Sequence, residues 1–169
     1  MSQLKAQWHK SLDEIPEHHW KILRGNQTNP FYEWQWLTAL ENSGSISTKK
    51  GWQPVHLALW RESCPIAVAP LYLKGHSYGE FIFDQVFAGL AEELGLNYYP
   101  KLLGMSPFSP VEGYRFFYAP GEDIQALTNL LINLIDNFAT QNGILSCNFL
   151  YVDLEWSSFI SSTKYLKWL

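Results

Sequence analysis

Hydrophobic residues recur along this chain with two different periods, and each period predicts a different kind of element. A repeat at every second residue indicates a half-buried strand, whereas a repeat at three to four residues indicates an amphipathic helix. The period of two is clearest over residues 54–60. A second apolar run, 66–73, follows the turn at 61–63, so the two runs predict an antiparallel hairpin. Pro70 interrupts the second run; because it cannot donate to a ladder, it marks an edge, a bulge or a splay between strands.

The helical period predicts the other principal elements. The clearest helix covers 122–141, with Ile124, Leu131 and Ile135 on one face and Gly143 as its cap. Further helices are expected at 15–23, 31–42 and 84–94, with another beginning at 157. Strands are expected at 4–12, 98–105 and 144–153, and 111–118 either pairs as a strand or crosses the surface. This order predicts an α+β fold with a mixed, mainly antiparallel sheet flanked by helices.

Composition limits the class of protein. The 169 residues are enough for one domain with a real core, and a net charge of −4 argues against broad DNA or RNA binding. An aromatic content of 16% exceeds what such a core can hide, which predicts a lined groove or an apolar surface that self-associates or meets another domain. Cys64 and Cys147 are expected as buried, reduced thiols. We see no signal peptide or membrane-spanning run, which favours a cytoplasmic protein.

Three side chains near the end of the 66–73 strand are candidates for catalysis: His76, Glu80 and Asp84. An imidazole can act as a general base on an amine near neutral pH, and a buried carboxylate can take the proton of an attacking amine. The alternatives are a histidine that only fixes its loop, and carboxylates that only cap a loop.

A second group is suited to binding an anionic cofactor. Lys74, Lys101 and Arg115 could meet a phosphate or a nucleotide-linked donor, although ordinary surface charge is the alternative. Ser106, Ser109 and Gly113 belong to a proline-rich loop whose backbone N–H groups could bind an anion. The prolines of this loop remove donors, so it could equally be a rigid connection between strands. We find no residues at the spacing of metal ligands and expect no metal.

Several segments in this order resemble the FemAB-like family of bacterial proteins. They are NPF (29–31), ALENSGS (39–45), GWQPVHL (51–57), APLYLKGHSYGEFIFD (69–84), YYPKL (98–102) and PFSPVEG (107–113). Members of this family carry tandem GNAT-type domains and are commonly labelled N-acetyltransferases or peptidoglycan biosynthesis-related proteins. The resemblance implies a GNAT-like fold, in which two central strands splay apart and an acyl donor enters the gap. It also implies that 1–169 is one GNAT-like domain, the N-terminal half of a longer two-domain protein.

The function that this resemblance implies is transfer of an acyl or aminoacyl group to a small-molecule or peptide amine. The donor would be acetyl-CoA or an aminoacyl-tRNA, and the sequence leaves both open. Direct attack by the amine needs no covalent enzyme nucleophile, which agrees with the absence of a Ser-His-Asp order. The rival interpretation is a binding or interaction module that keeps the GNAT-like fold without catalysis, as the high aromatic content would suit.

Overall fold

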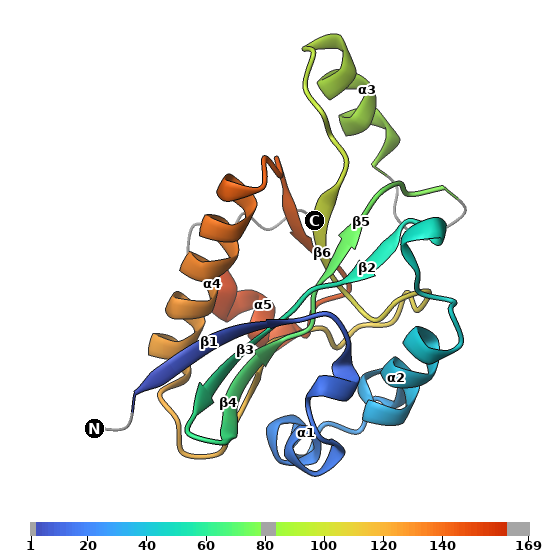
Figure 1. Cartoon of the computed structure of the whole chain (residues 1–169). Coiled ribbons are helices and arrows are strands. Elements are labelled where there is room, and N and C mark those ends of the chain that lie inside the picture. Colours follow the sequence, from blue (N-terminus) through green and yellow to red (C-terminus); the bar gives the residue numbers. More distant parts are fainter. Residues whose placement is uncertain (1–2, 79–83, 162–169) are drawn as a thin grey trace.

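A computed structural model describes residues 3–78 and 84–161 of the chain (Figure 1). The strands of this part are β1 (Leu4–His9), β2 (Trp52–Pro54), β3 (His56–Arg61), β4 (Cys64–Ala69), β5 (Tyr72–Lys74), β6 (Lys101–Gly104), β7 (Phe117–Tyr118) and β8 (Cys147–Phe149). Its α-helices are α1 (Glu17–Arg24), α2 (Trp34–Asn42), α3 (Gln85–Glu93), α4 (Ile124–Gln141) and α5 (Leu154–Ile160). Short 3-10 helices lie at η1 (Leu12–Glu14), η2 (Pro30–Tyr32) and η3 (Thr48–Lys50).

The predicted α+β class is confirmed, but the strands form two sheets where the sequence analysis expected one. One sheet has the order β1-β3-β4-β7 and is antiparallel throughout. The other has the order β2-β5-β6-β8, and in it only β6 and β8 run parallel. Figure 1 shows the sheets end to end, with the β2–β5 ribbon continuing the β3–β4 hairpin.

The two sheets meet at a break in the predicted hairpin. The expected strand 66–73 is divided at Pro70 into β4 and β5, and 54–60 is divided at Val55 into β2 and β3. The backbone N–H of Val55 still donates to the carbonyl of Leu71, at 2.9 Å, so the two chains stay together across the break. The Pro70 carbonyl accepts from the Tyr114 hydroxyl at 2.9 Å. Pro70 therefore marks the place where the ribbon passes from one sheet to the next.

A buried histidine completes the hydrogen bonding at this break. His56 Nδ1 accepts the N–H of Leu71 at 3.1 Å, and its Nε2 lies 2.9 Å from Glu41 Oε1. The other Glu41 oxygen accepts from the Ser11 hydroxyl and the Leu12 N–H, at 2.9 and 2.8 Å. Because Nδ1 is an acceptor here, the imidazole is neutral with its proton on Nε2. This network ties α2 and the start of the chain to the bend between the sheets.

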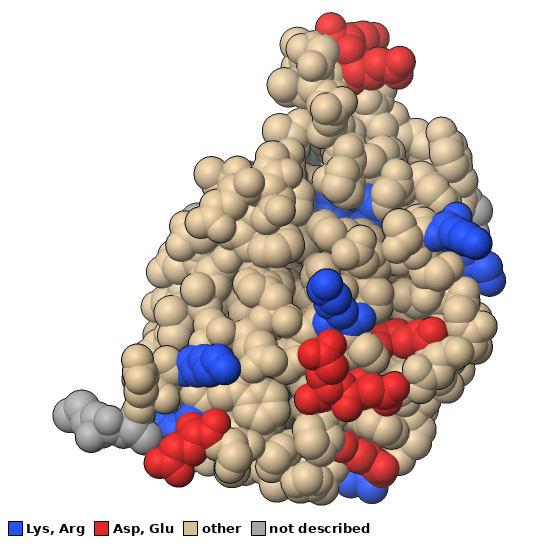
Figure 2. Space-filling model, viewed as in Figure 1, with Lys and Arg blue, Asp and Glu red and all other residues tan. Residues whose placement is uncertain are grey.

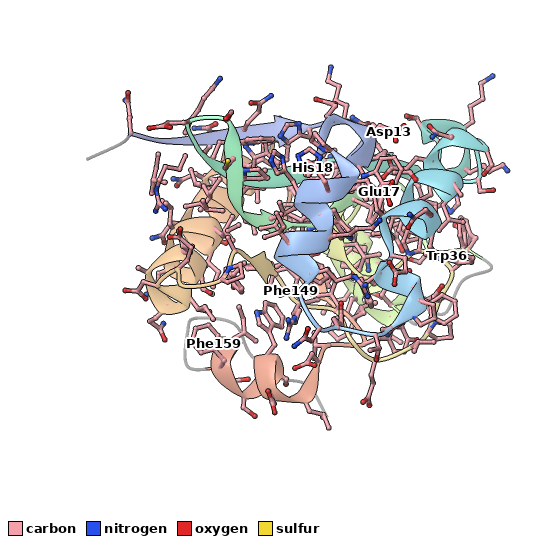
Figure 3. All side chains as sticks on the ribbon, turned by 90° about the horizontal axis from the view of Figure 1, so that it is seen from below. Asp13, Glu17, His18, Trp36, Phe149 and Phe159 are labelled. Carbon is pink, nitrogen blue, oxygen red and sulfur yellow. The ribbon has the colours of Figure 1, made fainter. Side chains whose placement is uncertain are left out.

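The core is built on both faces of the first sheet. Nearly every side chain of β4 is buried, as are those of the first four residues of β3, which requires cover on both sides. In Figure 1, α1 and α4 provide this cover. Leu131 and Ile135 of α4 are fully buried, as predicted for the apolar face of this helix, whereas Ile124 in its first turn is 49% exposed. Seen from below in Figure 3, Phe149 and Phe159 lie between α5 and the rest of the chain.

The remaining elements differ from the expectations in length more than in kind. The helix expected at 31–42 divides into η2 and α2, because Glu33 between them is extended. The strand expected at 144–153 shortens to β8, whose side chains are only half-buried. The final helix begins at Leu154, earlier than expected, and residues 162–169 lie outside the described part. Neither cysteine forms a disulfide, as expected, but the expected burial is wrong: Cys64 is exposed and Cys147 is only half-buried.

Candidate functional site

A cross-strand row of three large side chains lies on one face of the second sheet. Lys74 is the pairing partner of Trp52 on β2 and of Lys101 on β6. Directly opposite residues in antiparallel strands project to the same face, so these three side chains are neighbours. Lys74 Nζ lies 4.2 Å from the centroid of the Trp52 ring, a cation–π contact. Both lysines are buried, although the sequence analysis had also allowed them to be surface charges.

Asp84, which directly precedes α3, neutralises Lys101. Its carboxylate accepts from the Lys101 ammonium, from the Ser77 hydroxyl at 3.2 Å and from the Tyr99 hydroxyl at 3.1 Å. Burial pushes the pKa of Asp84 upward, but the Lys101 ammonium and the two hydroxyl donors outweigh it and hold the pKa below its ordinary value. Asp84 is therefore a carboxylate at neutral pH and a poor proton acceptor.

A cleft of about 690 Å³ opens beside this ion pair, between α3 and the chain that returns from it. Ser77 and Tyr99 line the cleft and also bond Asp84, which joins the cleft to the ion pair. Its other lining residues are Tyr78, Gln85, Ala88, Gly89, Glu92, Gly95, Leu96, Asn97 and Tyr98. None of these described lining residues carries a positive charge, so the cleft suits a neutral or cationic ligand.

Tyr98 and Tyr99 of the cleft remain neutral phenols. Burial, together with the Asp84 carboxylate nearby, raises the pKa of Tyr98 and of Tyr99 above the ordinary value. Their hydroxyls can therefore donate hydrogen bonds, and their ring faces can attract an ammonium group. The sequence analysis singled out neither residue, although YYPKL was among the segments that carried the family resemblance.

Of the predicted catalytic residues, the structure places Asp84 and His76 near the cleft. His76 stacks on Tyr78, with ring centroids 5.4 Å apart, and its Nδ1 is buried without a hydrogen-bond partner among the described residues. The ring packs against Gly51, where a Cβ would come within 2.5 Å of His76 Nε2. Glu80 falls within 79–83, outside the described residues, and its role stays a prediction.

The predicted cofactor residues fall into separate places. Ser106 lies five residues after Lys101, a distance of roughly 16 Å along an extended chain. Its backbone N–H donates to the Tyr32 hydroxyl and its own hydroxyl accepts from Trp36 Nε1, both at 3.2 Å. The Ser109 hydroxyl donates to the carbonyl of Pro107 at 3.1 Å. Both serines are buried and already have partners inside the protein.

Gly113 and Arg115 line a different pocket, of about 440 Å³, together with Gln27, Asn29 and Asp153. Arg115 Nε is buried there without a partner among the described residues. The structure thus brings Lys74, Lys101, Asp84 and His76 to one region and leaves the serine loop and Arg115 apart from it.

The described residues, 3–78 and 84–161, also bear on two other kinds of site. No group of three or more His, Cys, Asp or Glu side chains in that part of the chain could hold a metal ion. No helix within the described ranges is both long and apolar enough to cross a membrane.

Comparison with known proteins gives one family. The model of FemAB-like proteins, described as peptidoglycan biosynthesis/recognition, matches residues 11–169. The match extends on both sides of the segments between 29 and 113 that carry the resemblance. A search of curated proteins finds no significant match to this chain.

Proposed function

Because the chain belongs to the FemAB-like family of peptidoglycan biosynthesis/recognition proteins, we propose that it transfers an acyl or aminoacyl group to an amine of a peptide or small-molecule acceptor. The observation that carries this proposal is the aromatic cleft beside the buried Asp84–Lys101 pair. An ammonium group fits this cleft, because tyrosine faces and the Glu92 carboxylate attract it and no cation in the described lining repels it. The acceptor amine would therefore bind beside α3.

The acyl donor would enter where β6 and β8 separate. The N–H of Leu150 still donates to the carbonyl of Gly104 at 2.9 Å, but the Tyr151 carbonyl accepts from Gly113 and Tyr114 instead. The chain between Gly104 and Gly113 thus leaves the sheet at the end of a parallel strand pair. This divergence supports the GNAT-like layout, and with it acetyl-CoA or an aminoacyl-tRNA as the donor.

The chemical step in this proposal is direct attack. The acceptor nitrogen gives up its proton and forms a C–N bond with the acyl carbonyl, while the C–S or C–O bond to the donor breaks and the leaving group takes a proton. The Lys101 and Lys74 ammonium groups are buried and would act through their electrostatic field, without direct contact, on the negative charge that develops on the carbonyl oxygen. Asp84 would hold Lys101 in place, and His76 and Glu80 remain the candidates for the base.

The test is a transfer assay in which two adjacent carboxylates are compared. The purified chain is incubated with labelled acetyl-CoA or an aminoacyl-tRNA and a peptide that carries a free lysine amine. Glu92 lines the cleft and Glu93, its neighbour on α3, does not. We expect Glu92→Gln to raise the KM for the amine several-fold while Glu93→Gln leaves it unchanged. No transfer from either donor, or equal effects of the two variants, would refute the assignment of the cleft.

Recognition without transfer is the second candidate, and the family description itself includes it. A ligand that binds only the native state raises its melting temperature. A melting temperature that rises with the amine-bearing peptide, but not with acetyl-CoA, CoA or an aminoacyl-tRNA, would favour a binding module. The cytoplasmic location and the existence of a second domain stay predictions.

A further inference from the structure

Residues 84–99, which contain α3 and are called the arm below, carry the apolar face of this helix outward. Figure 1 shows this helix projecting from the body of the molecule, beyond the end of the second sheet. Of the nine described residues of α3, only Ala91 is buried. A helix this short is marginal in water, because most helical stability in proteins comes from packing of an apolar face. Some other surface must therefore supply that packing.

The apolar residues of the arm form one stripe. Val86, Leu90 and Leu94 follow one another at intervals of four residues, with Phe87 beside them, and all four are more than half exposed. Successive residues of a helix are separated by about 100°, which places this stripe opposite the cleft-lining side chains Gln85, Ala88, Gly89 and Glu92. A partner on the stripe would consequently leave the cleft open.

The charges of the arm identify the kind of partner. Residues 84–99 contain three carboxylates and no Lys or Arg. In Figure 2 the acidic side chains of α3 cover its far end, with no basic side chain around them. Helices that lie on membranes are typically rich in Lys and Arg on their polar face, so an anionic lipid surface fits this arm poorly.

A second copy of the arm matches these charges. Glu92 and Glu93 lie at the C-terminal end of α3, where the negative end of the helix dipole disfavours them. In an antiparallel pair the Glu93 carboxylate, which lies beside the stripe, comes near the N-terminal, positive end of the partner helix, whereas Glu92 stays on the cleft side. The two-fold axis that relates the two copies would pass close to Leu90, with Val86 of one copy against Leu94 of the other.

The exposed area is sufficient for a weak dimer. The stripe alone offers on the order of 400 Å² of apolar surface, so a symmetric pair buries roughly 800 Å², which is in the range of weak, transient interfaces. We propose that α3 is a self-association surface, through which two copies of the chain pair antiparallel with their clefts facing away from the contact.

Sedimentation velocity of the full chain, from about 1 µM to about 1 mM, tests this proposal. Leu90 and Ile22 are matched apolar residues, each on a helix and exposed by 53% and 52%. Wild type and Ile22→Glu should dimerise alike as concentration rises, whereas Leu90→Glu should lose the dimer. A wild type that stays monomeric throughout, or equal behaviour of the two variants, would overturn the proposal.

Two further measurements test the orientation. Glu93→Lys improves the charge at the C-terminus of its own helix but places a cation at the partner's N-terminus, so it should weaken the dimer about tenfold. With Cys64 and Cys147 changed to serine, Leu90→Cys should form a disulfide dimer on oxidation and Ile22→Cys should not. Tighter dimerisation by Glu93→Lys, or equal cross-linking at both positions, would exclude the antiparallel pair.

A membrane contact is the competing outcome. Wild type should not sediment with vesicles of phosphatidylcholine and phosphatidylglycerol. If a monomeric wild type binds these vesicles and Leu90→Glu does not, the stripe is a membrane contact and the proposal is wrong.

Discussion

Removing the charge of Asp84 alone is expected to destabilise the fold more than removing both charges of its ion pair. Lys101 is 1% exposed, and the Asp84 carboxylate is its ion-pair partner. Asp84→Asn keeps the size of the side chain but leaves a buried ammonium without that carboxylate. Breaking a buried pair from one side typically costs about 3–5 kcal/mol. Because a domain of this size is stable by only about 5–15 kcal/mol, this loss is easily measured.

The double variant Asp84→Asn/Lys101→Met is the informative comparison. A buried ion pair can often be replaced by apolar side chains at little cost, so the double variant should recover to within about 2 kcal/mol of wild type. Urea unfolding followed by circular dichroism measures both, and an unchanged m value shows that the same surface is exposed on unfolding. If Asp84→Asn costs under about 1 kcal/mol, or the double variant is the less stable of the two, the pair is not buried as described.

The same pair predicts a dependence on pH. The folded pKa of Asp84 lies below that of an unfolded aspartate, about 3.9. Its contribution to stability is therefore complete above that value and is lost as the pH falls through the folded pKa. In Lys101→Met the ammonium group that lowers the folded-state pKa of Asp84 is absent, so this pKa should rise. Acid unfolding should therefore begin at a higher pH than in wild type.

Three other substitutions test the bend and the core. Glu41→Gln should lower the free energy of unfolding in urea by about 1–3 kcal/mol. The amide has one acceptor oxygen, which cannot serve both His56 on one side and the Ser11 hydroxyl and Leu12 N–H on the other. An unchanged free energy of unfolding would refute the network. Gly104→Ala should lower the melting temperature, since its Cβ would lie 2.3 Å from the Tyr114 hydroxyl; an unchanged value would mean that the ring moves freely. Leu131→Ala should lower the free energy of unfolding by about 2–5 kcal/mol. A nearly unchanged urea midpoint would mean that Leu131 does not lie in the core.

The elements with long, regular patterns were predictable from sequence. The apolar face of α4 reflects burial against one continuous core, which periodicity records directly. The alternation over 54–60 predicted a strand correctly, but its half-buried character was wrong, because His56 and Ala58 are as buried as Leu57. The division into two sheets was not predictable in the same way. Pro70 indicated an interruption, but the change of sheet also depends on Tyr114 and His56, which are distant in sequence and satisfy the backbone groups on either side of it.

The candidate site was predictable only in part. Lys74, Lys101 and Asp84 were selected as chemically capable residues near strand ends, and the structure joins Asp84 to Lys101. The burial of the two lysines was missed, because a single sequence does not reveal that Trp52 contacts Lys74 and that Tyr98 contacts Lys101. The role of Glu41 left a readable signal: it follows Leu37 by four residues and therefore lies on the buried face of α2.

The bend lies close in sequence to the lysines of the candidate site, so we expect the Glu41 network to position these lysines as well as to stabilise the fold. Lys74 lies only three residues after Leu71, the residue whose N–H is held by His56 and whose carbonyl is held by Val55. Over three residues an extended chain reaches only about 10 Å, so the direction of β5 at the bend fixes where Lys74 stands beside Lys101. A Glu41→Gln variant that remains folded should consequently lower kcat for acyl transfer while leaving the KM for the amine unchanged, since the cleft beside α3 is not altered. If KM rises and kcat does not change, the network acts on the cleft and not on the lysines.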